Sequence, residues 1–120
     1  MRWKLTVRVG PKVTRSTFVA VAEALDELEA RARELAVTAP DKVVDAKFKR
    51  FEPVEQVVAR LELAGPERFV SSVRVGVDVR GDGSMEAYRG RVRREVIAER
   101  DSESALTALR RTVAQDDHDG

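Results

Sequence analysis

Apolar and polar residues alternate along several short stretches of this chain, a pattern typical of half-buried β-strands. The first stretch runs from Trp3 to Val9, with an apolar residue at every second position. Gly10-Pro11 should end this strand, and the β-branched and aromatic residues of 12–19 predict a second strand that returns beside it. Two further strands are predicted over residues 44–49 and 56–64.

Two segments instead show the spacing of amphipathic helices. From Val21 to Val37 the apolar residues recur every three or four positions, with charged residues elsewhere on the helical wheel. Near the C-terminal end, Asp101 or Ser102 is predicted to cap a shorter helix. The apolar stripe of that second helix consists of Leu106, Leu109 and Val113.

A hairpin is predicted between Val70 and Ile97, around the sequence Arg80-Gly81-Asp82-Gly83-Ser84. An Asp-Gly pair tolerates the positive φ angles of a two-residue turn, so Asp82 and Gly83 are the expected loop. In that register one face of the hairpin is apolar, with Val77 opposite Tyr88, Val75 opposite Gly90 and Val73 opposite Val92. The other face then pairs Arg74 with Arg91.

Short connections between these segments favour antiparallel pairing, and two amphipathic helices can cover one face of such a sheet. We therefore predict an α+β two-layer sandwich with the order ββαββββα and a mainly antiparallel sheet of about five to six strands. Residues 1–115 should form one domain, followed by a disordered acidic tail at 116–120. The expected core residues are Trp3, Leu5, Val7, Phe48, Leu61, Val73, Val75, Val77, Tyr88 and Val92 from strands, and Leu25, Leu28, Leu35, Leu106 and Leu109 from helices.

The uncovered face of this sheet carries many arginines. If Leu61 lies beside Val73, then Arg60 lies beside Arg74 in the neighbouring strand, which predicts a row of Arg60, Arg74 and Arg91. Like charges opposite each other destabilise a sheet by ~0.2 to 1 kcal/mol, so the row invites an explanation. The candidate contact residues for an anion, a nucleic acid or a protein partner are Arg60, Arg74, Arg89, Arg91 and Arg93.

Three explanations of this face remain open. Long arginine stems can cover apolar surface in water, with Glu62, Asp78 and Glu95 as local partners. Alternatively, planar guanidinium groups can bind phosphates or an acidic protein surface. A second copy of the chain could also cover the face. The predicted outer face has no aromatic residue, which argues against the stacking used to bind single-stranded bases.

Composition narrows the possible environment and partners. Charged residues make up 36% of the 120 residues, yet the formal net charge is only +1, so any charge-based function must be local. The chain has no cysteine, which excludes disulfides and thiolate chemistry. No apolar run is long enough to span a membrane, and the start of the sequence lacks the apolar core of a secretory signal. These features predict a cytoplasmic protein without a membrane partner.

The order of helix, three antiparallel strands and helix between Val21 and Ala114 resembles the double-stranded RNA-binding domain in outline. That family grips phosphates with a basic cluster at the start of its last helix. The corresponding positions here are Ser102, Glu103, Ser104 and Ala105, none of which is basic. The chain therefore resembles the family in topology but not in its phosphate-binding residues. The family's RNA contacts come mostly from helices and a loop, so an arginine-rich sheet face is not its means of recognition.

No motif assembles a catalytic site. The single histidine, His118, lies in the predicted tail, and the chain shows no nucleophile elbow, phosphate loop, calcium loop or cofactor motif. The favoured function is a non-enzymatic interaction or assembly module, possibly homodimeric, supported by exposed apolar candidates at Val58, Phe69 and Val70. The first alternative is an anion or nucleic-acid binder that uses the arginine-rich face. The second alternative is a small-molecule or enzymatic site between sheet and helices.

Overall fold

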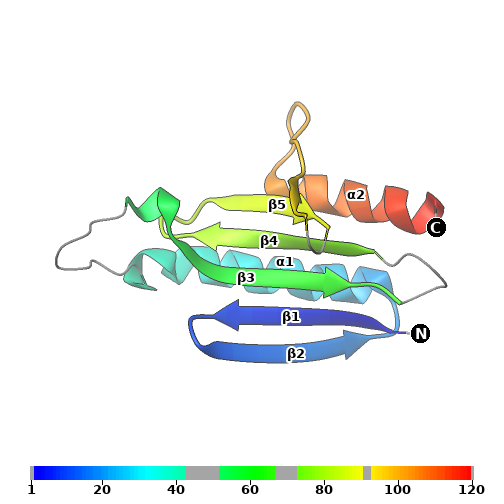
Figure 1. Ribbon diagram of the computed structural model, residues 1–120, viewed down its shortest axis with the longest axis horizontal. Coiled ribbons are helices and arrows are strands. Elements are labelled where there is room, and N and C mark those ends of the chain that lie inside the picture. The colour runs from blue at the N-terminus through cyan, green and yellow to red at the C-terminus, as the bar shows by residue number, and fades with distance from the viewer. Residues whose placement is uncertain (1, 43–51, 67–72, 91–92, 120) are drawn as a thin grey trace.

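The computed structural model describes residues 2–42, 52–66, 73–90 and 93–119. These residues form one six-stranded sheet and two α-helices, with the strands in the spatial order β2-β1-β3-β4-β5-β6 (Figure 1). Every neighbouring pair of strands is antiparallel, which confirms the α+β class and the order ββαββββα. The elements are β1 (Trp3–Val9), β2 (Lys12–Phe18), α1 (Val21–Thr38), η1 (Ala39–Lys42), η2 (Pro53–Glu55), β3 (Val57–Ala64), β4 (Arg74–Arg80), β5 (Met85–Arg89), β6 (Glu95–Val96) and α2 (Ala105–Asp119).

Both helices cover the same face of the sheet. Helix α1 packs against β1, β2, β3 and β4, whereas α2 packs against β4 and β5. Leu28 of α1, Leu109 of α2 and Leu61 of β3 are each at most 1% exposed and belong to one apolar cluster, so the hydrophobic effect holds the two layers together. The predicted core residues that the structure confirms as buried are Trp3, Leu5, Val7, Leu25, Leu28, Leu35, Leu61, Val75, Val77, Leu106 and Leu109.

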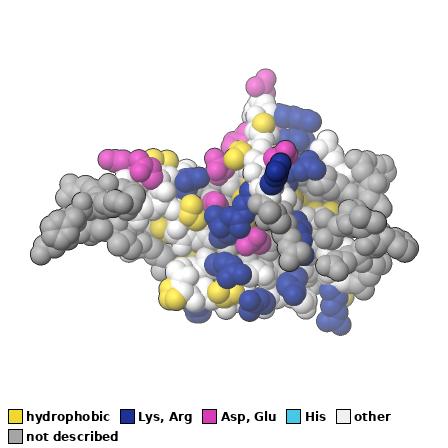
Figure 2. All heavy atoms as spheres, in the orientation of Figure 1, with side chains coloured by type: hydrophobic (Ala, Val, Ile, Leu, Met, Phe, Trp, Pro, Cys, Tyr) yellow, Lys and Arg dark blue, Asp and Glu magenta, His cyan; other side chains and the backbone are white. Residues whose placement is uncertain are grey.

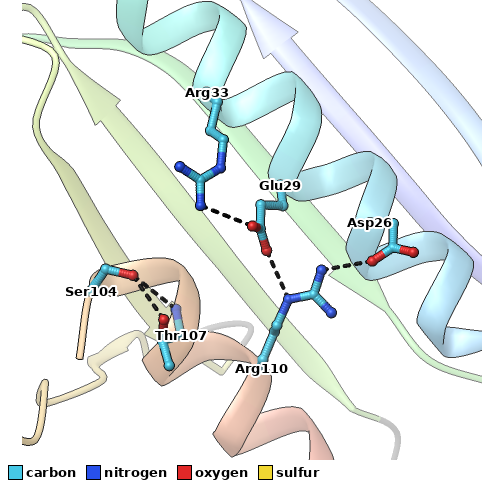
Figure 3. Close-up of polar contacts among 6 residues, drawn as sticks. All are labelled: Asp26, Glu29, Arg33, Ser104, Thr107 and Arg110. Carbon is cyan, nitrogen blue, oxygen red and sulfur yellow. Dashed lines mark hydrogen bonds and ion pairs between the residues drawn. The ribbon is translucent and has the colours of Figure 1, made fainter. Parts of the chain in front are cut away.

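A network of charges joins the two helices above this core (Figure 3). Arg110 of α2 donates to Glu29 at 2.8 Å and to Asp26 at 2.8 Å, both on α1. Arg33 donates to the same Glu29 at 2.9 Å. The hydrogen bond from Arg110 has the largest effect on Glu29, followed by that from Arg33, and both lower the pKa of Glu29. The hydrogen bonds that Arg110 donates to Asp26 and Glu29 raise the pKa of Arg110. The network fixes how α2 lies beside α1.

Helix α2 begins later than the sequence pattern predicts. The Ser104 hydroxyl accepts a hydrogen bond from the Thr107 N–H at 3.2 Å, and the Ser104 carbonyl accepts one from Ala108 (Figure 3 shows Ser104 and Thr107). Ser104 is therefore the N-cap, and the prediction of Asp101 or Ser102 is wrong. Ser102 instead has a φ of 67°, in the left-handed region, so it belongs to a turn before the helix.

Replacing Ser104 by alanine is expected to lower the free energy of unfolding by about 1 kcal/mol, because the Thr107 N–H would lose its acceptor. Urea unfolding followed by circular dichroism measures the change. Ser102→Gly is the matched control, since glycine adopts a φ of 67° without strain and should leave stability unchanged or slightly higher. Similar losses for both variants would contradict the assignment of the cap to Ser104.

The hairpin between β4 and β5 has a three-residue loop, not the predicted two-residue loop. Val79 pairs with Met85, and the Arg80 N–H donates to the Ser84 carbonyl across the loop Gly81-Asp82-Gly83. The Gly83 N–H donates a hydrogen bond to the Arg80 carbonyl, which forms a β-turn, and Gly83 has a φ of 86°. This combination of a turn and a left-handed residue is the usual three-residue hairpin, and it changes the pairing by one residue.

A one-residue change of register moves every β5 side chain to the opposite face of the sheet. Ala87, not Tyr88, pairs with Val77 and enters the core, where it is 2% exposed. Tyr88 pairs with Gly76 and lies on the face away from the helices. The prediction that this face has no aromatic residue is therefore wrong. Val73 packs at the rim of the core, whereas Val92 falls outside the described residues.

The pairing between β3 and β4 also differs from the prediction, by four residues. Leu61 pairs with Val77 and not with Val73, so Arg60 lies opposite Asp78 and not opposite Arg74. The apolar face is the same in both registers, because a shift by an even number preserves the side on which each residue lies. The predicted row of Arg60, Arg74 and Arg91 does not form, and Arg91 lies outside the described residues.

Several other features predicted from the sequence fall on residues that the structure does not describe. The predicted strand at 44–49, with Phe48, and the exposed candidates Phe69 and Val70 lie outside the described residues. The short β6 supplies the sixth strand instead. Val58 is not exposed but packs partly buried against the core. The disorder of 116–120 stays a prediction, although α2 is assigned as far as Asp119. Neither described helix is long and apolar enough to cross a membrane.

Candidate functional site

The sheet face opposite the helices is open in the described part of the chain, and Lys and Arg side chains gather over it (Figure 2). The strand registers place the side chains of this outer face in rows that run across the strands. One row contains Arg8, Arg60, Asp78 and Glu86, and a second contains Arg15, Thr6, Glu62, Gly76 and Tyr88. A third row contains Thr17, Lys4, Ala64 and Arg74.

In the first row every arginine has an acidic partner. The Arg60 guanidinium donates to both carboxylate oxygens of Asp78, at 2.7 and 3.1 Å, and these bonds raise the pKa of Arg60. Asp78 is 8% exposed, so Arg60 and not water is the main partner of its carboxylate. At either side of this pair, Arg8 lies 3.9 Å from Glu62 and Arg80 lies 3.0 Å from Glu86. The like-charged Arg8 and Arg60 lie opposite each other, each balanced by its own carboxylate.

Tyr88 lies in the second row, next to Gly76. Its ring crosses the position where a side chain at Gly76 would lie, and it is only 4% exposed. The guanidinium carbons of Arg94 and Arg60 lie 5.0 and 5.8 Å from the ring centroid, within the range of cation–π attraction. The hydroxyl is buried with no hydrogen-bond partner among the described residues. Burial first, and then the charges of Glu62 and Asp78, raise the pKa of Tyr88, so the phenol stays protonated.

The third row borders a hollow of about 550 Å³ between the ends of β1, β3 and β4. Its charged lining consists of four cationic side chains and one acid, which gives a local charge of +3 from four positive charges and one negative charge. Glu62, the acid, lies beside Arg8. The residues that line the hollow are Arg2, Lys4, Thr6, Arg8, Glu62, Leu63, Ala64, Gly65, Pro66, Arg74, Val75 and Gly90.

Three of these cations differ from the other arginines of the outer face. Among the described residues, Arg2, Lys4 and Arg74 form neither an ion pair nor a side-chain hydrogen bond. Arg60, by contrast, is held by a nearly buried carboxylate. The hollow therefore provides several guanidinium and ammonium donors that can bind an anion. The carboxylate of Glu62, which also lines the hollow, would repel that anion.

The five arginines proposed from the sequence do not form one site. Arg74 lines the hollow, and Arg60 lies on the same face but is engaged with Asp78. Arg89 pairs with Val75 in the sheet and so belongs to the helix-covered side, at its exposed margin. Arg93 is exposed in the connection between β5 and β6. Arg91 falls outside the described residues.

Arg2, Lys4 and Arg8 line the hollow but were not predicted from the sequence as site residues. The signal was available, because Lys4 and Arg8 alternate with the apolar residues of β1 and must lie on the outer face. What could not be seen was that β1 lies between β2 and β3, near the middle of the sheet. That position brings its basic residues beside Arg74, which is 70 positions after Lys4 in the sequence.

The described residues include no cluster that could hold a metal ion. No group of three or more His, Cys, Asp and Glu residues among them could hold a metal ion. A second hollow, of about 210 Å³, lies between α1 and the β1–β2 hairpin. Its lining is Val7, Val9, Lys12, Thr14, Arg31 and Leu35, which provides cations but no general base.

Comparison with protein-family models, with curated proteins and with solved structures finds no match for this chain. Its function must therefore be argued from its own residues. The basic hollow on the outer face is the feature that best supports such an argument.

Proposed function

We propose that this chain is a non-enzymatic interaction module that binds an anionic partner in the basic hollow of its outer sheet face. One observation carries the proposal: Arg2, Lys4 and Arg74 line the same hollow without an acidic partner among the described residues. Cations that serve only solubility need not converge, and converging like charges repel one another. An anion between them removes that repulsion and accepts charge-assisted hydrogen bonds.

The rest of the outer face supports this location. Arg8, Arg60 and Arg80 already have carboxylate partners, so they contribute little attraction at a distance. Among the described residues, the hollow bordered by β1, β3 and β4 carries an excess of positive charge. A chain with a net charge of only +1 would thus attract anions at one place and not over its whole surface. We expect the module to act in the cytoplasm, as its lack of cysteine suggests.

Titration of the isotope-labelled protein with pyrophosphate, followed by amide NMR shifts, tests this proposal. The expected perturbations lie at Lys4, Ala64 and Arg74, with an affinity that falls as salt rises. Arg74→Gln should weaken binding severalfold. Arg100→Gln, a change of the same charge at an exposed position before α2, should not. Shifts scattered over all arginines, or none at all, would contradict the proposed site.

A second candidate function is self-association, which the free edge of β2 favours. This strand has seven residues, pairs only with β1 among the described strands, and is exposed along most of its length. Such an edge can pair with another strand, although charged residues such as Lys12 and Arg15 discourage pairing. Sedimentation equilibrium at several concentrations tests it, since a monomer at all of them would exclude a homodimer.

A further inference from the structure

We infer that the anion held by this face is the phosphodiester backbone of a single nucleic-acid strand that runs across the β-strands from β2 to β4. The inference rests on the proposed function and goes beyond it, because it names the chemistry and the path of the partner. It depends on where the unpaired cations of the outer face lie relative to one another.

These cations form a track and not a compact cage. Arg15 of β2 pairs with Thr6, so it is a diagonal neighbour of Lys4 on β1, at a Cα distance of roughly 7–8 Å. Lys4 and Arg74 are both level with Ala64, one strand away on either side, which separates them by roughly 10 Å. Arg2 extends the same hollow beyond the end of β1. Arg15 and Arg74 are three strand spacings apart, roughly 15 Å, so a single phosphate in the hollow leaves Arg15 without a contact, whereas a chain of phosphates can contact all four cations.

The rest of the outer face limits the partner to one backbone. Arg8, Arg60 and Arg80 are engaged by Glu62, Asp78 and Glu86, so this part of the face offers carboxylates as well as cations. A second phosphate backbone laid over it would meet these acids, and the cation beside them, Arg94, lies against the Tyr88 ring. A DNA or RNA duplex presents two backbones on either side of a groove, and the track provides cations for one.

The track contacts phosphates without reading bases. Tyr88 is an aromatic residue of the outer face, but it is only 4% exposed and Arg94 lies over its ring. The ring therefore has no surface on which a base could stack. Base stacking on aromatic rings is the usual source of affinity for single strands, so binding here must come from charge. The expected behaviour is therefore weak sequence preference, strong salt dependence, and affinity that rises with strand length until the track is filled.

Fluorescence anisotropy with labelled oligothymidylates of increasing length tests the inference on the whole chain. Four cations on the track, Arg15, Lys4, Arg2 and Arg74, predict a slope of about −3 in a plot of log affinity against log salt. Affinity should rise with length over the first few nucleotides and then level off. Lys4→Gln with Arg74→Gln should lower the affinity at least tenfold and reduce the slope by about half. Lys12→Gln with Arg100→Gln, off the track, should change neither.

Each other outcome has a definite meaning. Pyrophosphate that binds as tightly as a long oligonucleotide would overturn the track and leave the proposed anion site intact. Polyglutamate of equal length that binds as tightly would overturn the choice of nucleic acid, and a duplex that binds more tightly would overturn the single strand. Binding of none of these probes would overturn both the inference and the proposed function. Melting curves confirm that the neutral variants are folded, and unaltered binding by the folded Lys4 and Arg74 variant would overturn the location.

Discussion

Arg60→Met is expected to lower the free energy of unfolding by about 2 to 3 kcal/mol, the larger part of it from Asp78. Asp78 is 8% exposed and accepts both of its hydrogen bonds from Arg60, at 2.7 and 3.1 Å. Methionine keeps the apolar stem over the sheet but leaves the carboxylate unpaired. Urea unfolding at neutral pH measures the loss, from the midpoint and slope of the transition.

Arg80→Met is the control, because it breaks an ion pair of a single hydrogen bond, at 3.0 Å, on the same face. Its partner Glu86 has a side chain that is 44% exposed, so water can replace the lost cation and the cost should stay below about 1 kcal/mol. Combining Arg60→Met with Asp78→Leu should recover most of the stability lost in the single variant, since no unpaired charge remains. Equal losses for Arg60→Met and Arg80→Met would show that burial of Asp78 does not decide the effect.

Gly76→Ala is expected to destabilise the fold by about 1 to 3 kcal/mol through overpacking. A Cβ at this position would overlap the Tyr88 ring and would lie 2.9 Å from the Leu61 carbonyl oxygen. Neither neighbour can move freely, because Tyr88 is only 4% exposed and Leu61 belongs to the central strand β3. Thermal and urea unfolding should both register the change.

The same substitution in a Tyr88→Val background separates the ring from the backbone. With the ring removed, alanine at position 76 should cost at least ~1 kcal/mol less than it does in the original protein. A double-mutant cycle gives this coupling directly. Coupling close to zero would place the clash elsewhere and would contradict the position of Tyr88 on the outer face.

Local sequence patterns predicted most elements because they depend on nearby residues. The alternation in β1 and the spacing in α1 each follow from which side of one element meets the core, and both elements are present where expected. The hairpin shows where such reasoning fails. Asp82-Gly83 supports a two-residue turn as well as Gly81-Asp82-Gly83 supports a three-residue turn, and the choice between them decides which face Tyr88 occupies.

The candidate site was predicted less well because it depends on pairing between distant strands. Valines at 73, 75, 77 and 79 fit the apolar face of β3 equally well in registers that differ by two or four residues. Hydrophobic pattern therefore could not decide whether Arg60 faces Arg74 or Asp78. The position of β1 between β2 and β3 was likewise invisible, and it is this position that brings Lys4 beside Arg74.

The central place of β1 also affects the order in which the chain can fold. As the chain is synthesised, β1 can pair with β2 at once, but its other edge must wait until β3 ends at Ala64. During that interval an unpaired strand edge and the apolar side of α1 are exposed together, which favours aggregation. Helix α2, whose Arg110 contacts Glu29, 81 positions earlier in the sequence, can dock only after its own residues, Ala105–Asp119, have been synthesised. A chaperone would therefore act most usefully before residue 64 has emerged.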